Sequence, residues 1–226
     1  MKISIVIPTI DEAAVVGQAV ESAQQAGASE IIIVDGGSHD ATCQVAEQLG
    51  ACVISSKRGR AVQQNAGAGI ATGDALMFLH ADCRLPESGL DEIGHVLTAS
   101  SQCVGGFFRQ RIDHPGRMYR LIEAGNLVRA NVLKWAYGDQ GVFVRSSVFA
   151  DIGGFPEIAI MEDLYLMKRL KRCGHLACVN APLLVSARRW QAQGVVRQTV
   201  RNWCLLTAAH LGVSPTVLAR HYPRPT

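Results

Sequence analysis

The segment Ile31-Ile32-Ile33-Val34-Asp35-Gly36-Gly37 joins a continuous apolar run to an acidic turn with two glycines. A run of the same kind, Ile3-Ser4-Ile5-Val6-Ile7, is followed directly by Pro8. Apolar runs without alternation predict strands that are buried on both faces, as in a parallel sheet. The two segments therefore indicate strands in the interior of an α/β protein.

The first half of the chain repeats this pattern, with helical segments between the strands. Ser38 follows the second strand and is the expected N-cap of the helix after it. Strand–helix alternation of this length predicts a doubly wound sheet with right-handed crossovers. The other expected elements of this half are strands at 51–54 and 75–79 and helices at 11–26, 39–49 and 60–71.

The second half is less regular, and its predicted elements are more scattered. We interpret residues 1–190 as one α/β domain with a mixed, mainly parallel sheet flanked by helices, and residues 191–226 as a C-terminal helical arm. The expected elements are strands at 104–112, 141–145 and 182–187 and helices at 115–135, 162–173 and 194–211.

Composition suits a globular protein with a sizeable core and argues against several other classes. Apolar residues make up 48% of the 226 residues, and the net charge of +3 gives no reason to expect a nucleic-acid partner. The seven cysteines form no C-x-x-C pair, which is typical of reduced thiols in the cytoplasm. We expect no signal peptide, and no stretch reaches the roughly 18 apolar residues of a membrane span.

Acidic residues follow the predicted strands, where ligands bind in a doubly wound sheet. Asp35 could hold a base or ribose hydroxyl, or it could simply begin a turn. Asp82 could be a ligand for Mg²⁺ or Mn²⁺ that bridges two phosphates, or a turn residue before Pro86. His80 could be a second ligand, a phosphate donor or a structural histidine.

Further charged residues stand at predicted helix starts. Lys57-Arg58-Gly59-Arg60 places three cations where the helix dipole disfavours them, which suggests a diphosphate site as the alternative to a solvated turn. Glu162 and Asp163 could stabilise a helix N-terminus, or one of them could be a general base. Arg188-Arg189-Trp190 suits a phosphate or sugar, but a surface arginine pair beside a buried tryptophan is equally ordinary.

Five motifs, taken in order, resemble those of the family 2 glycosyltransferases of the GT-A fold. Each is weak alone, but their order and spacing over roughly residues 1–190 are specific. The length, the Leu-His-Ala-Asp motif and the Arg-Arg-Trp ending are most similar to the bacterial rSAM/selenodomain-associated transferase 2 type. The motifs are Ile-Val-Ile-Pro-Thr-Ile-Asp-Glu-Ala (5–13), Ile-Val-Asp-Gly-Gly-Ser-His-Asp-Ala-Thr (33–42), Arg-Gly-Arg-Ala-Val-Gln-Gln-Asn-Ala-Gly (58–67), Leu-His-Ala-Asp (79–82) and Gly-Gly-Phe-Pro…Met-Glu-Asp-Leu (153–164).

The resemblance implies a nucleotide-diphosphate sugar as donor, with UDP-sugars favoured, and Mg²⁺ or Mn²⁺ as cofactor. Asp82 matches the last acid of the family's Asp-x-Asp metal motif, and His80 stands where the family often has an acid. The donor side would also use Pro8, Thr9, Glu12, Asp35, Gly36, Arg58 and Arg60.

The resemblance also implies an acceptor side. Asp163 matches the catalytic base of inverting members, with Glu162 beside it. From its place in a tight glycine loop, Asp139 could hold the acceptor or the donor sugar, with Gln140 beside it. Arg189 and Trp190 resemble the Arg-Trp of processive relatives, although the full five-residue motif with its leading glutamine is absent.

Two enzyme classes and one binding class compete with this interpretation. A nucleotidyltransferase would carry a Gly-x-Gly-x-Arg loop after the first strand, and a dinucleotide-dependent oxidoreductase would carry G-x-G-x-x-G there. The chain has Pro-Thr-Ile-Asp-Glu-Ala at that place, which argues against both. A non-catalytic protein that binds sugar nucleotides is disfavoured because the candidate metal ligand and the candidate base are both present in the sequence.

The arm carries an apolar stripe at helical spacing. Such a stripe usually packs on its own domain or on a partner subunit, which could be a second copy. Because arginines lie beside this one, it could also rest on a membrane surface, such as the inner face of the cell membrane, and serve a lipid-linked acceptor. The stripe comprises Val196, Val200, Trp203, Thr207 and Leu211, with Arg197 and Arg201 beside it.

Overall fold

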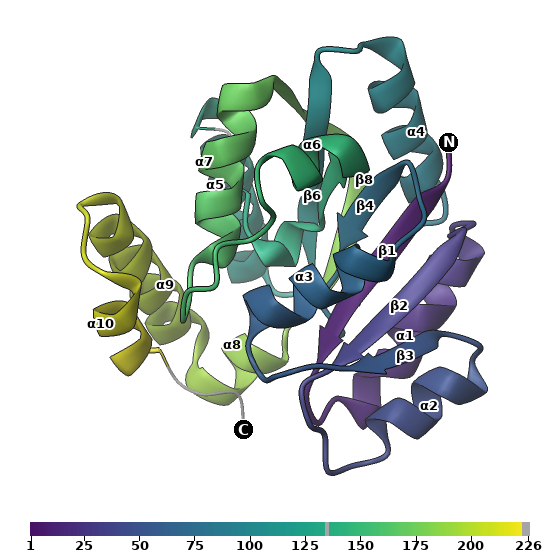
Figure 1. The fold of residues 1–226 in the computed structure, drawn as a ribbon. Helices are drawn as coiled ribbons and strands as arrows, with labels where there is room; N and C mark the ends of the chain where they lie inside the picture. Colours follow the sequence, from purple (N-terminus) through teal and green to yellow (C-terminus); the bar gives the residue numbers. More distant parts are fainter. Residues whose placement is uncertain (134–135, 223–226) are drawn as a thin grey trace.

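A computed structural model describes residues 1–133 and 136–222, and within them an eight-stranded mixed sheet runs through the molecule (Figure 1). The strand order is β3-β2-β1-β4-β7-β6-β8-β5. This confirms the predicted α/β class with a mixed, mainly parallel sheet. The strands are β1 (Ile3–Thr9), β2 (Glu30–Asp35), β3 (Cys52–Ser55), β4 (Ala75–Phe78), β5 (Cys83–Arg84), β6 (Cys103–Asp113), β7 (Val142–Arg145) and β8 (His175–Ser186).

The first four strands of this order are parallel, and this aligns their carboxyl ends. Thr9 at the end of β1 pairs with Asp35 at the end of β2, and β4 lies on the other side of β1. The strand β7 then runs antiparallel to both β4 and β6, while β6 and β8 are parallel. The short β5 follows β4 in the chain but pairs with β8 at the far edge, so the sheet curls.

Helices cover both faces of the sheet because its strands are apolar on both sides. Ile5 and Ile7 pack under α1, α2 and α4, whereas Val6 packs on the face that α3, α6 and α7 cover. The helices are α1 (Ala13–Gln25), α2 (Thr42–Gln48), α3 (Arg60–Ile70), α4 (Gly89–Ala99), α5 (Arg117–Leu133), α6 (Ser146–Asp151), α7 (Glu162–Cys173), α8 (Arg188–Gln193), α9 (Val195–His210) and α10 (Pro215–Arg220), with a 3₁₀ turn η1 at Gly138–Gln140.

Ser38 is not the N-cap of α2, so that prediction was wrong. The cap is Ala41, and the Ser38 hydroxyl donates to the Asp35 carboxylate instead. The Asp40 carboxylate accepts the Thr42 N–H at 3.0 Å and so satisfies the first turn.

Six elements had no prediction. Five of them are short (α6, α8, α10, β5 and η1), whereas α4 carries Leu90, Ile93 and Leu97 at helical spacing and was missed. The strand β8 also begins seven residues before the predicted start at 182.

The predicted stripe on α9 faces away from the domain. Trp203 is 58% exposed and Leu211 80%, whereas Leu205 and Ala209 on the opposite side of the helix are buried. Those two residues pack beside Leu164 of α7. In the part of the chain that the structure describes, no helix has the length and apolar content needed to cross a bilayer.

Candidate active site

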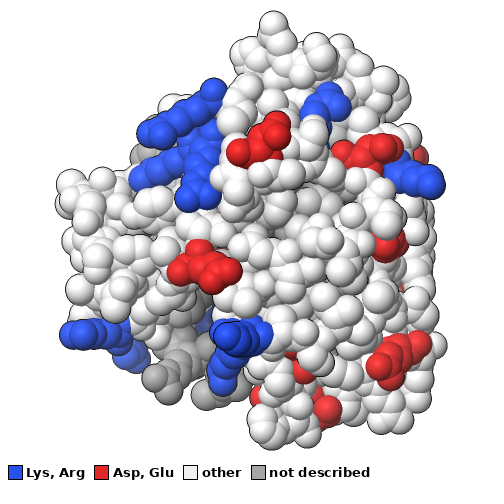
Figure 2. Space-filling view, viewed as in Figure 1, with Lys and Arg blue, Asp and Glu red and all other residues white. Residues whose placement is uncertain are grey.

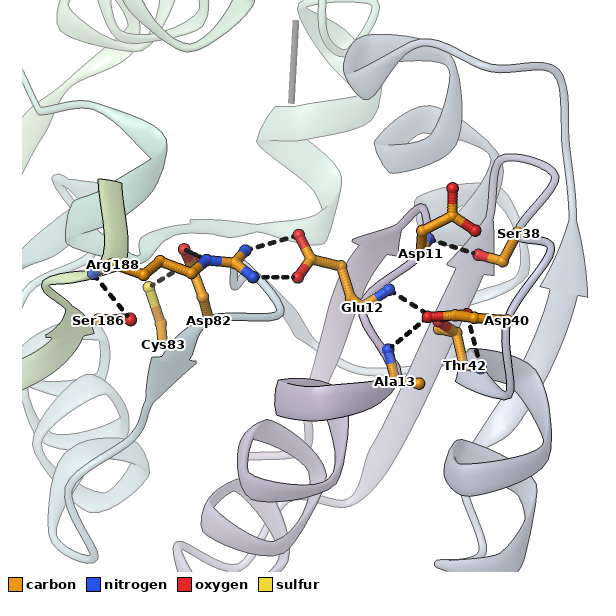
Figure 3. Close-up of polar contacts among 10 residues, drawn as sticks. All are labelled: Asp11, Glu12, Ala13, Ser38, Asp40, Thr42, Asp82, Cys83, Ser186 and Arg188. Carbon is orange, nitrogen blue, oxygen red and sulfur yellow. Dashed lines mark hydrogen bonds and ion pairs between the residues drawn. The ribbon is translucent and has the colours of Figure 1, made fainter. Parts of the chain in front are cut away.

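The loops after β1 and β2 are tied to each other by side chains (Figure 3). The Ser38 hydroxyl accepts the N–H of Asp11, and the Asp11 carboxylate accepts the N–H of His39 at 2.7 Å. The Thr42 hydroxyl accepts the N–H of Glu12 at 2.8 Å. These bonds fix the Glu12 backbone at the carboxyl edge of the sheet.

Asp35 is the last residue of β2, and Gly36 begins the loop that follows it. The Asp35 carboxylate accepts the N–H groups of Gly37 and Ser38 at 2.9 and 3.0 Å. Burial alone would raise the pKa of Asp35, but the hydrogen bonds from Ser38 and Gly37 outweigh it and lower the pKa. A Cβ on Gly36 would meet Ile10 at 2.9 Å. These contacts support the turn interpretation of Asp35, and its ligand role stays a prediction.

Arg188, the first residue of α8, binds two acids, one from the loop after β1 and one from the loop after β4 (Figure 3). Its guanidinium contacts the Glu12 carboxylate at 2.7 Å and the Asp82 carboxylate at 3.2 Å. The Asp82 side chain is only 6% exposed. Burial opposes its charge, but Arg189 and Arg188 together lower the pKa of Asp82. Asp82 is therefore an ionised, buried carboxylate that is already paired with a cation.

His80 connects the Asp82 loop to the η1 turn. A Cβ placed on Gly138 would lie 2.3 Å from His80 Nε2, so the ring rests directly on the glycine. The Gly138 N–H in turn donates to the Asp163 carboxylate at 2.7 Å. Burial and the nearby Arg60 lower the pKa of His80 to about 3, so the ring is neutral. The predicted donor and acceptor halves thus meet at Gly138.

Replacing Gly138 by alanine should destabilise the protein by about 1–3 kcal/mol, because the new methyl group overlaps the His80 ring and the Asp163 contact must shift. The matched control is Gly94→Ala in α4, where a Cβ meets nothing within 4 Å and should stabilise the helix by about 0.5–1 kcal/mol. Urea denaturation of both variants measures the difference. If both substitutions are neutral, the close approach of His80 and Gly138 is wrong.

Arg60 and Glu162 form a second bridge between the halves. The Arg60 guanidinium at the start of α3 lies 3.3 Å from the Glu162 carboxylate at the start of α7. The Glu162 side chain is only 2% exposed, and burial raises its pKa even though Arg60 works in the opposite direction. Asp163, the next residue, is half-buried and accepts the N–H of Leu164 at 2.7 Å with its second oxygen. Glu162 thus has a cation as partner, whereas within the described part of the chain Asp163 has only backbone donors.

A polar network holds the η1 turn, whose Gly138 N–H donates to Asp163. Gln110 on β6 donates to the Asp139 carboxylate at 2.7 Å and accepts from Asn126 on α5. Arg129 on α5 donates to the Gln140 side chain at 3.0 Å and stacks over the Tyr137 ring at 4.2 Å. Burial raises the pKa of Asp139, with Arg129 acting against the shift. The network fixes Asp139 and Gln140 in the η1 turn.

The remaining predicted site residues have more varied positions. Arg58 is exposed, and Arg189 contacts the Tyr222 hydroxyl at 3.3 Å. Trp190 is buried in the core against Tyr119, as the ordinary interpretation of that residue expects. Pro8 is half-buried, and the buried Thr9 hydroxyl has no hydrogen-bond partner among the described residues.

Several residues that position the site were not identified from the sequence. Gln63 on α3 donates to the carbonyls of Thr9 and Val34 and so holds the ends of β1 and β2 together. Its place in the Arg-Gly-Arg-Ala-Val-Gln-Gln motif was a usable signal. The contacts of Gln110 and Arg129 had no signal, because they join residues from separate elements.

The residues at the end of β4 offer few protein ligands to a metal ion. Among residues 1–133 and 136–222, no three His, Cys, Asp or Glu side chains come together in a way that could hold one. Asp82 fits as one ionised oxygen ligand, and the buried His80 Nε2 has no hydrogen-bond partner in the described structure. A Mg²⁺ or Mn²⁺ ion would therefore need further oxygens from a bound ligand such as a diphosphate.

Comparison with known families and curated proteins gives matches in the region that carries this site. Residues 4–151 match the sequence model of the family described as "Glycosyl transferase family 2". A "PGL/p-HBAD biosynthesis glycosyltransferase" of Mycobacterium tuberculosis (H37Rv) is 38% identical over 94 residues, and so is a Mycobacterium bovis protein of the same description. The match spans 38% of this chain and 37% of each relative.

Solved structures share the fold at low sequence identity. S. aureus TarS, residues 1–349, in complex with UDP-GlcNAc has a TM-score of 0.66 at 16% identity, over 82% of this chain and 58% of that one. Glucosyl-3-phosphoglycerate synthase from M. tuberculosis, in complex with Mn²⁺, UDP and glucosyl-3-phosphoglycerate, has a TM-score of 0.61 at 20% identity, over 80% of this chain and 70% of that one. The predicted GT-A fold is confirmed by these similarities.

Proposed function

The chain belongs to glycosyl transferase family 2, as its motifs predicted, and from this premise we propose that it transfers a sugar from a nucleotide-diphosphate sugar to an acceptor hydroxyl. The observation that carries the proposal is the meeting of the Asp82 loop with Asp163 across His80 and Gly138. A candidate binding site for the donor phosphates and a candidate base thus lie at one edge of the sheet. The narrower resemblance to the rSAM/selenodomain-associated transferase 2 type stays a prediction.

In this proposal the donor lies on the loops after β1, β2 and β4. The nucleotide side is lined by Glu12, Asp35 and the Thr9 hydroxyl, and Arg60 lies near the phosphates. Asp82 would hold Mg²⁺ or Mn²⁺ together with the donor diphosphate. When bound, the ion would offset the charge that gathers on the leaving nucleoside diphosphate. UDP is the favoured nucleotide, as in the solved complexes of fold relatives.

Asp163 is the proposed general base. It would accept the proton of the acceptor hydroxyl while that oxygen bonds to the anomeric carbon. The bond from that carbon to the diphosphate oxygen breaks at the same time, and its electron pair leaves with the nucleoside diphosphate. Attack from the face opposite the leaving group inverts the anomeric centre. Glu162 is less suited to this role because it is buried against Arg60.

The acceptor side of the proposed site is formed by Asp139 and Gln140, with Arg129 holding Gln140 in place. The acceptor itself is proposed only by class, as a hydroxyl compound that could be lipid-linked. A cytoplasmic location, at the inner face of a membrane, is part of the same proposal.

Binding of the donor should raise the melting temperature, because a ligand that binds only the folded state stabilises it by mass action. We expect one nucleotide class among UDP-, GDP- and dTDP-sugars to raise it more with Mn²⁺ than without. The same screen with Asp163→Asn should give the same shifts. If no nucleotide sugar shifts the transition of the unaltered chain, the proposed function is wrong.

A further inference from the structure

The large exposed apolar side chains of this protein are concentrated on one group of helices. Among the described residues, ten of the twelve lie on α5, α9, α10 and the turn between the last two, and the other two are Met1 and Ile70. Single exposed apolar residues are ordinary, but a contiguous group marks an interaction surface. The ten are Met118, Leu121, Val128, Val132, Val196, Val200, Trp203, Leu211, Val213 and Val217.

Most of this group lies on two helices, α5 and α9, and forms one stripe on each. On α5 the exposed positions Met118, Leu121, Val128 and Val132 recur at helical spacing, with Gly125 between them. On α9 the stripe runs through Val196, Val200 and Trp203. A Cβ on Gly125 would lie 3.8 Å from the Trp203 ring, so the two stripes meet there and form one surface.

The C-terminal part of the chain, which contains α9, carries charge of one sign. Residues 164–226 contain ten lysines and arginines and not one aspartate or glutamate, although the whole chain has a net charge of only +3. Arg117 and Arg197 are exposed beside the stripes. The one acid of α5, Glu123, is 11% exposed and lies 3.0 Å from Arg120. Figure 2 shows the same asymmetry on one face, with blue side chains gathered toward α7 and α10 and most red ones over the β1–β3 half.

We infer that the α5–α9 surface docks on an anionic lipid membrane. An apolar stripe beside arginines matches both parts of such a membrane, since the apolar side chains enter the interface and the guanidiniums meet the lipid phosphates. A second copy fits less well, because a two-fold contact would bring together two copies of the same arginine-flanked surface, with no exposed acid among the described residues of α5 and α9 to offset the charge.

The two helices that carry this surface also contact the acceptor side of the site, α9 through its opposite face, and this part of the inference rests on the proposed function. Arg129 reaches from α5 to Gln140 at 3.0 Å. On α9, Leu205 and Ala209 pack with Leu164, the residue after Asp163. A membrane on the exposed face of these helices would lie one helix away from the candidate base, within reach of a lipid-linked acceptor.

Flotation of the purified full chain with vesicles tests the inference. The chain should float with phosphatidylcholine vesicles that contain phosphatidylglycerol, and weakly or not at all with phosphatidylcholine alone. Added salt should lower the bound fraction because it screens the arginines. The double variant Val128→Ser/Trp203→Ser should bind about tenfold more weakly or worse, and Arg197→Glu about fivefold or worse.

Ile70→Ser is the matched control, because it removes an exposed apolar side chain outside the surface and should bind as the unaltered chain does. Circular dichroism of each variant verifies that it is folded. Absence of flotation with anionic vesicles overturns the inference. So does sedimentation that shows a dimer which the double variant loses while its vesicle binding is unchanged. Flotation needs no donor, and Asp163→Asn should float normally, so this result is independent of the proposed function.

Discussion

Asp163→Asn should lower the rate of sugar transfer by about 10²–10⁴-fold, the range that general base catalysis contributes. The amide cannot accept the proton of the acceptor hydroxyl. It can still accept one of the two backbone hydrogen bonds, from Gly138 or Leu164, that the carboxylate accepts. The loss of the other should lower the free energy of unfolding by only about 0.5–1.5 kcal/mol. The expected result is a folded protein that binds donor and does not turn it over.

The matched control for this variant is Glu157→Gln. It makes the same acid-to-amide change on an exposed residue in the loop before α7. Its transfer rate and donor affinity should equal those of the unaltered chain. Steady-state rates with calorimetric donor titrations separate the two effects. Full activity in Asp163→Asn would remove the base from the proposed mechanism.

Asp82→Asn should abolish the part of donor binding that depends on Mn²⁺. Asp82 is the one carboxylate at the end of β4 that fits a metal ligand, and an amide is a much weaker partner for a hard cation. The substitution also leaves Arg188 with Glu12 alone as an ion-pair partner. Asp113→Asn is the control, since Asp113 also pairs with an arginine, Arg84, but on the exposed β5–β6 side.

Arg188→Met sharpens the same prediction. It leaves the Asp82 and Glu12 carboxylates without their shared cation, so a divalent ion should bind there at least as well as in the unaltered chain. Calorimetric titration of UDP with and without Mn²⁺ measures all three variants. Unchanged Mn²⁺ dependence in Asp82→Asn would refute the metal role of Asp82.

The parallel half of the fold was predictable because its signals are local. The apolar runs of β1 and β2 and the helices between them could be read from neighbouring residues alone. The start of β8 and the short helix α8 could not, since their sequences lack a clear period. The helix α4 was missed although Leu90, Ile93 and Leu97 recur in it at helical spacing. Ser38 shows a different failure, because a good N-cap residue is used by Asp35 of the loop before it.

The candidate site divides in the same way. Asp82, Glu162 and Asp163 stand in motifs that can be recognised in sequence. The contact of Arg188 with Glu12 joins residues 176 positions apart, and only the curling of the sheet brings them together. The contact of His80 with Gly138 likewise depends on how β4 and η1 meet. Sequence motifs therefore named the chemical groups, and tertiary structure supplied their partners.

The most direct test is the rate of nucleoside diphosphate release from the nucleotide sugar that stabilises the chain most. It is measured with Mn²⁺ for the unaltered chain and for Asp163→Asn side by side. We predict that the unaltered chain releases nucleoside diphosphate, slowly when water is the acceptor. The variant should bind the donor with the same affinity and release nucleoside diphosphate at least about 10²-fold more slowly. Equal rates for the two proteins, or a bound donor that neither consumes, would contradict this prediction.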